Sequence, residues 1–123
     1  ADLPLGELAT MLARIAPHVG VGVVSRADGA TVAVRNFDVR GDWCGAAYAV
    51  RAAAERISQE SCECFEHVGE NAAFALLFTP SGDHAVVIDA PMIDRLSPQR
   101  FRSQVRQIAA FLRIAEAPAS KGS

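Results

Sequence analysis

The sequence predicts an α+β fold in the order α-β-β-α-β-β-β-α, with a five-stranded antiparallel sheet and helices on both faces. Apolar residues recur at helical spacing in some segments and alternate, or run continuously over a few residues, in others. Asp28-Gly29 lies between two valine-rich segments, and Asp-Gly is a strong hairpin signal because such turns need positive φ. Short turns also separate the last three apolar segments, which favours an antiparallel meander.

The first helix is predicted over residues 4–16, followed by strands over 19–25 and 31–36. Pro17 ends the helix, whose apolar face is formed by leucine and isoleucine at three- and four-residue steps: Leu5, Leu8, Leu12 and Ile15. In the first strand the alternation places three valines on one face, and two glycines with Val24 on the other. The small Gly20 and Gly22 indicate that another part of the chain packs closely on that second face.

The second helix is predicted over residues 42–59, with Asp42 as its N-cap. Its apolar seam has heptad-like spacing and consists of Trp43, Ala47, Val50, Ala54 and Ile57. In the simplest interpretation this helix only covers the sheet. We favour a second one, in which the seam covers the sheet while Cys44, Tyr48 and Arg51 meet a second chain.

Strands are then predicted over residues 62–68, 72–79 and 84–90, and the last helix begins at Ser97-Pro98. The last two strands are nearly all apolar, as expected for strands buried on both faces. The strand 62–68 alternates instead. We expect its even-numbered residues on one face and its odd-numbered residues on the other: Cys62, Cys64, Glu66 and Val68 against Glu63, Phe65 and His67.

The composition indicates one globular domain, which we place at residues 1–116, with 117–123 as a flexible tail or cloning remnant. Half of the 123 residues are hydrophobic, and the formal net charge is −2, so nothing favours binding to nucleic acid or to a membrane. Three cysteines cannot all pair within one chain, which favours a reducing, cytoplasmic setting. We expect neither a signal peptide nor a membrane span.

No motif indicates catalysis, a cofactor or a metal. A phosphate-binding loop is missing, and Gly20-Val-Gly22 lies inside a predicted strand. Cys62-x-Cys64 with His67 lacks the spacing of a zinc site, and no nucleophile lies at a recognisable distance from a base. We therefore expect no catalytic, cofactor-binding or metal-binding residues.

The charges are distributed unevenly. Acidic residues gather between Glu55 and Glu70, and arginines between Arg95 and Arg113. Either these are two solvated faces that balance each other, or they form a polarised surface that orients a protein partner. In the second case the partner-binding residues are those of one helical stripe: Arg102, Arg106 and Arg113.

This pattern resembles the roadblock/dynein light chain family. The resemblance rests on the element order, the Asp28-Gly29 hairpin, the alanine-rich helix at 43–59 and the meander that follows it. It implies a non-enzymatic module that forms dimers, with sheets joined edge to edge and second helices paired, and that serves as a platform for small Ras-like GTPases. By analogy the strand 62–68 is the pairing edge, so the interface set becomes Cys44, Tyr48, Arg51, Cys62, Cys64, Glu66 and Val68. The connections at 36–41 and 91–96 depart from the family pattern.

Our hypothesis is a cytoplasmic homodimeric scaffold that binds a small GTPase or a related signalling protein. Three alternatives stay open. A type III secretion-type chaperone would place three strands before its middle helix and two after. A profilin- or PAS-like sensory module would enclose a small ligand, and an enzyme built on Cys62, Cys64 and a histidine would need a thiol of unusually low pKa.

Overall fold

The computed structural model describes residues 5–14, 19–91 and 97–115 of the chain. Three helices and five strands follow one another in the predicted order, which confirms the fold class. The elements are α1 (Leu5–Leu12), β1 (Gly20–Ser25), β2 (Thr31–Arg35), α2 (Trp43–Ser58), β3 (Cys64–Val68), β4 (Ala72–Phe78), β5 (His84–Pro91) and α3 (Pro98–Ala115).

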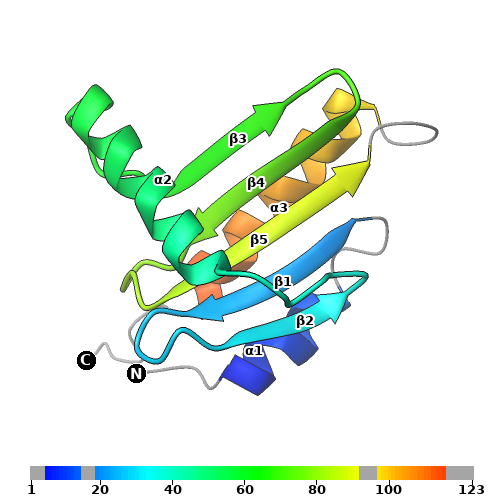
Figure 1. Cartoon of the computed structure of the whole chain (residues 1–123). Helices are drawn as coiled ribbons and strands as arrows, with labels where there is room; N and C mark the ends of the chain where they lie inside the picture. Colours follow the sequence, from blue (N-terminus) through cyan, green and yellow to red (C-terminus); the bar gives the residue numbers. More distant parts are fainter. Residues whose placement is uncertain (1–4, 15–18, 92–96, 116–123) are drawn as a thin grey trace.

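The five strands form one sheet in the order β2-β1-β5-β4-β3, and each neighbouring pair is antiparallel (Figure 1). Strand β5 lies in the centre and joins the first hairpin to the meander, with Val21 opposite Ile88 and Leu76 opposite Val87. Strands β2 and β3 form the two edges.

Helices cover both faces of the sheet, as predicted. Figure 1 shows α2 in front of the sheet and α1 and α3 behind it. The rear core is the larger one, because it joins the inner faces of two helices to one whole face of the sheet. Its fully buried members include Leu8, Leu12, Val21, Ile88, Phe101 and Ile108. The front core centres on Val24, Ala47, Leu76, Phe78, Ala85 and Val87.

The glycines of β1 allow close packing on the front face, as their size predicted. A Cβ atom at Gly22 would collide with the ring of Phe37, and one at Gly20 would lie 2.7 Å from the carbonyl oxygen of Asn36. Phe37 packs against the front core and against Trp43, at 4.8 Å between ring centroids. The segment between β2 and α2 therefore covers the part of β1 that α2 does not reach.

The predicted ends of some elements were wrong by a few residues. Helix α1 ends at Leu12, where the N–H of Arg14 turns back to the carbonyl of Met11 and the guanidinium of Arg35 binds the carbonyl of Ala13. In the first hairpin only Gly29 has positive φ, so the turn is longer than a two-residue one. The predictions for Ile15, Pro17, Arg95, the segment 92–96 and the tail after residue 116 lie outside the described residues.

Within the described part of the chain, no helix combines the length and apolar character needed to cross a membrane.

We predict that Gly22→Ala lowers the free energy of unfolding by about 1–3 kcal/mol, the usual cost of forcing an extra methyl group into a packed site. The added Cβ would displace the Phe37 ring. The control is Gly6→Ala, because a Cβ at Gly6 in α1 meets nothing within 4 Å and alanine favours the helix. Urea unfolding of both variants measures the difference, and equal stability of the two would contradict the packing described.

Candidate protein-interaction site

Both ends of α2 are fixed by local hydrogen bonds. The Asp42 carboxylate accepts from the N–H of Gly45 at 2.8 Å, which confirms Asp42 as the N-cap. At the other end Gln59 adopts the left-handed conformation, and its N–H donates to the carbonyl of Glu55. Local contacts therefore fix the residues at which α2 begins and ends.

The N-terminal half of α2 is tied to the sheet of the same chain. The Tyr48 hydroxyl donates to the carbonyl of Gly82 at 2.8 Å, and its ring packs on Phe78. The Cys44 thiol reaches the carbonyl of Ser25. The Arg51 guanidinium lies 5.1 Å from the centre of the Phe78 ring, a cation–π contact.

These contacts bear on three of the predicted interface residues. Cys44, Tyr48 and Arg51 are only partly exposed, and each contacts the chain's own sheet or its neighbouring turns. Their role in a dimer interface stays a prediction. The sequence could not reveal these contacts, because all three residues fit equally well on a helix that meets a second chain.

The C-terminal half of α2 does not cover the sheet. Ala47 is 2% exposed, but Ile57, the last residue of the predicted seam, is 85% exposed. The prediction that Ile57 packs on the sheet was therefore wrong. Figure 1 shows why: α2 crosses the sheet obliquely, and its C-terminal end reaches past the start of β3.

An open groove lies between α2 and the uncovered part of the sheet. It has a volume of about 280 Å³, and apart from Asp89 its lining is apolar. The helix contributes Trp43, Ala46, Ala47 and Val50, and the sheet contributes Phe74, Leu76, Val87 and Asp89. No spacing in the sequence predicted this groove, although the small side chains of the alanine-rich helix leave room for it.

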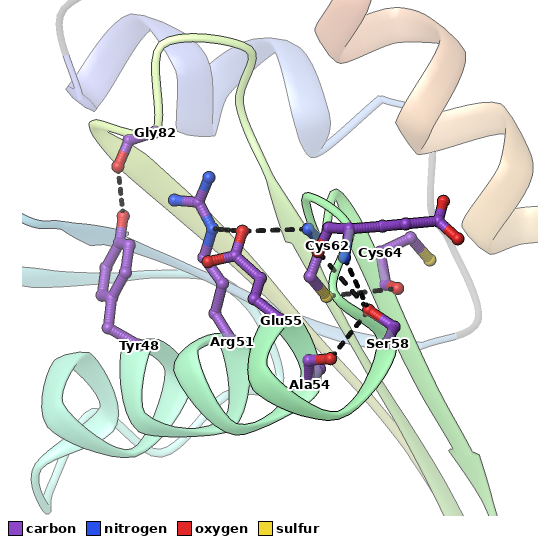
Figure 2. Close-up of polar contacts among 9 residues, drawn as sticks. Tyr48, Arg51, Ala54, Glu55, Ser58, Cys62, Cys64 and Gly82 are labelled. Carbon is purple, nitrogen blue, oxygen red and sulfur yellow. Dashed lines mark hydrogen bonds and ion pairs between the residues drawn. The ribbon is translucent and has the colours of Figure 1, made fainter.

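The connection from α2 to β3 is held by Glu55 (Figure 2). Its carboxylate accepts from the backbone N–H of Cys62 at 3.0 Å and forms an ion pair with Arg51 at 3.4 Å. The N–H of Cys62, and then Arg51, hold the pKa of the Glu55 carboxyl below its usual value. This contact fixes where the edge strand begins relative to the helix.

Strand β3 begins at Cys64, two residues later than predicted, and this changes the place of Cys62. Cys62 packs against the front core, whereas Cys64 lies beside Ala109 and Leu112 of α3. The prediction that the two cysteines share a face was wrong, because the Glu55 contact keeps Cys62 out of the strand. From Cys64 onward the predicted alternation is confirmed.

The outer edge of β3 has no strand beside it among the described residues. The carbonyl of Glu63 accepts from the N–H of Phe78, so the alternation of an antiparallel pair directs the backbone groups of residues 64, 66 and 68 away from β4. On the front face the Phe65 ring stacks on Phe74, and the His67 ring packs against Phe74 in a tilted arrangement. Val68 packs against the rear core. Of the predicted interface residues, Glu66 and Val68 thus offer backbone groups that have no strand partner among the described residues, whereas the carbonyl of Cys64 accepts from the Cys62 thiol at 3.6 Å.

The thiols of Cys62 and Cys64 are not activated. Partial burial, then the carboxylate of Glu66, raise the pKa of Cys64 to about 11, and burial followed by Glu55 also raises the pKa of Cys62. A reactive cysteine needs the opposite shift. The described residues also contain no group of three histidine, cysteine or acidic side chains placed to hold a metal ion.

The predicted partner-binding arginines lie on the exposed side of α3. Arg102, Arg106 and Arg113 are all exposed, and Arg113 lies 3.8 Å from the carboxylate of Glu63. This exposed pair connects the basic helix to the start of the edge strand. Such pairs contribute little to stability, so Arg113 remains available to a partner.

Similarity to known proteins is found at the level of structure. No family model and no curated sequence matches the chain. Among solved structures, MglB of Myxococcus xanthus superposes with a TM-score of 0.64 at 15% identity, over 92% of this chain and 95% of that one. A roadblock/LC7 domain of Streptomyces avermitilis gives 0.59 at 15% identity, over 94% and 98%. The chain has the roadblock/LC7 fold.

A third roadblock-fold structure concerns assembly. It is described as MglB with a tetrameric arrangement, and it gives a TM-score of 0.53 at 18% identity over 91% of this chain and 88% of that one. Proteins with this roadblock fold therefore include one that assembles from several chains.

We predict that Tyr48, the single tyrosine of the chain, loses its proton at a higher pH in the folded protein than in the unfolded chain. Burial, then the neighbouring Cys44, raise the pKa of Tyr48 to about 12. Because the folded pKa lies above the unfolded value of about 10, the stabilisation is complete below pH 10 and is lost as the pH rises towards 12. Absorbance at the tyrosinate band measures this titration, with the unfolded chain in urea as control. A midpoint near 10 in the folded protein would contradict the buried, bonded hydroxyl.

We also predict that Glu55→Gln lowers stability at neutral pH, with Glu60→Gln as the control, because the Glu60 side chain is exposed. The pKa of Glu55 is lower in the folded chain, so its stabilisation is present above the unfolded value of about 4.3 and is lost as the pH falls through the folded value. The difference in melting temperature between wild type and Glu55→Gln should therefore shrink in acid. A difference that does not depend on pH would rule out the charged contact.

Proposed function

We propose that the chain is a non-enzymatic, homodimeric scaffold of the cytoplasm that binds a small Ras-like GTPase or a related signalling protein. The observation that carries the proposal is an edge strand, β3, whose outer side has no strand partner in the described part of the chain. It lies beside an open, largely apolar groove, in a chain with the roadblock/LC7 fold. An open strand edge readily pairs with another chain, so its exposure needs a structural reason. Pairing with a second copy provides one and closes with two-fold symmetry.

The basic face of α3 supports a second binding role. Helix α3 lies behind the sheet and α2, which forms one wall of the groove, lies in front of it (Figure 1). A dimer formed at β3 therefore leaves the exposed arginines of α3 open to a partner. An acidic surface on the partner would be attracted to them. The element order, with two strands before α2, is not that of the chaperone alternative. The groove is open, which is unlike the enclosed pocket expected of a sensory module.

The dimer is tested by the mass of the purified protein in solution. Light scattering at tens of micromolar should give twice the mass of the chain. A strict monomer at that concentration would contradict the homodimer, whatever the partner is.

The partner is tested by calorimetric titration with a purified small Ras-like GTPase, loaded with GDP or with a non-hydrolysable GTP analogue. We predict that Arg106→Glu weakens binding about tenfold, which corresponds to roughly 1.4 kcal/mol. The control Arg14→Glu makes the same charge change on an exposed arginine outside α3. If neither variant alters binding, the α3 surface is not the binding site. If no tested GTPase binds, the claim that the partner is a small Ras-like GTPase is contradicted.

A further inference from the structure

Helix α2 carries two apolar features that nothing in the described part of the chain covers. One is the side chain of Ile57, which is 85% exposed near the C-terminal end of the helix. The other is the groove beside the N-terminal half, lined on the helix by Trp43, Ala46, Ala47 and Val50. A protrusion and a depression thus lie at opposite ends of one helix.

An exposed apolar side chain such as Ile57 is ordinary by itself. The groove is the feature that the packing of a single chain leaves unexplained. It measures about 280 Å³, well above the roughly 150 Å³ that accommodates a benzene molecule in a protein core. It is large enough to receive apolar side chains from another molecule, and leaving it empty would expose the Phe74 ring to water.

The spacing along α2 makes the two features complementary between copies of the same helix. Residues 46, 50, 53 and 57 follow at steps of four, three and four, so they lie along one side of the helix. When two such helices pair in antiparallel fashion around a two-fold axis, the C-terminal end of each lies beside the N-terminal half of the other. Each contact is then made twice, as two-fold symmetry requires. Along that side Ala46 and Ala53 are exposed and small, which permits close approach.

The groove also adjoins the free edge of the sheet. Its sheet wall includes Phe74, whose ring contacts Phe65 and His67 of β3, with centroids 6.1 Å and 5.4 Å away. The surface offered by the groove is therefore continuous with the strand edge at which we propose that two copies join. The helix wall of the groove carries no charge, and the charged residue of the lining, Asp89, belongs to the sheet wall and is exposed.

We infer that Ile57 of one copy inserts into the groove of a second copy, and that the reciprocal insertion completes both grooves. This inference rests on the proposed homodimer and adds its contact residues. Trp43, Val50 and Phe74 would then be covered by a side chain of the partner copy.

The first test is the dissociation constant of the dimer, measured by sedimentation over a concentration series. We expect Ile57→Asp to raise it at least tenfold, because a buried carboxylate would enter each apolar groove. The matched control is Ala110→Asp, which puts a carboxylate in place of an exposed apolar side chain of α3, on the opposite face of the sheet from α2. Circular dichroism checks that both variants are folded.

A second test uses cross-linking and does not depend on a weakened variant. In a chain whose three native cysteines are replaced by alanine, Ala46→Cys in one copy should form a disulfide with Ile57→Cys in another. Ala46→Cys mixed with Arg56→Cys is the control, because residue 56 lies on another side of the helix.

The outcomes separate this inference from the homodimer itself. If the wild-type protein is a monomer at tens of micromolar, both the homodimer and the insertion of Ile57 are contradicted. A dimer whose dissociation constant is unchanged by Ile57→Asp, and which forms no disulfide between residues 46 and 57, would overturn the insertion and leave the homodimer standing. A small apolar ligand retained in the groove, detected by native mass spectrometry of the wild-type protein, would also overturn it.

Discussion

The structure depends on how α2 is held over the front face of the sheet. Cys44 attaches the helix to the end of β1, whereas Tyr48 and Arg51 attach it to the end of β4 and the turn that follows. Glu55 attaches the loop after the helix to the start of β3. With both points fixed, the helix must cross the strands obliquely. It covers Val24, Phe78 and Ala85 but leaves the region around Phe74 open. The groove and the exposed Ile57 follow from this one constraint.

The rear face shows what a fully covered face of the same sheet looks like. There α1 and α3 bury Val21, Leu77 and Ile88 completely, and no large apolar side chain of that core stays exposed. Because each Å² of buried apolar surface contributes about 25 cal/mol, the larger rear core stabilises the fold more than the smaller front core does. Interaction surfaces are built from partly open faces such as the front one, because apolar area left uncovered in one chain can stabilise a contact with another.

Much of the fold could be predicted from the sequence, because local patterns determine it. The valine alternation of β1, the proline at the start of α3 and the aspartate before α2 each indicated an element that the structure contains. The interaction site was less accessible. Whether Tyr48 faces the sheet or a second chain depends on the crossing angle of α2, which no spacing encodes. Likewise Cys62 lies outside β3 because its backbone N–H donates to the carboxylate of Glu55, seven residues earlier. The alternation of side chains along the sequence cannot reveal such a contact.

Amide hydrogen exchange at β3 tests most directly whether the open side of the sheet is an interface. The N–H groups of Glu66 and Val68 point away from β4, so within one chain they have no strand partner among the described residues. If two copies join at this edge, these amides should exchange slowly, and their protection should increase with protein concentration as dimers form. Exchange at the rate of exposed amides, unchanged from micromolar to millimolar concentration, would contradict the account.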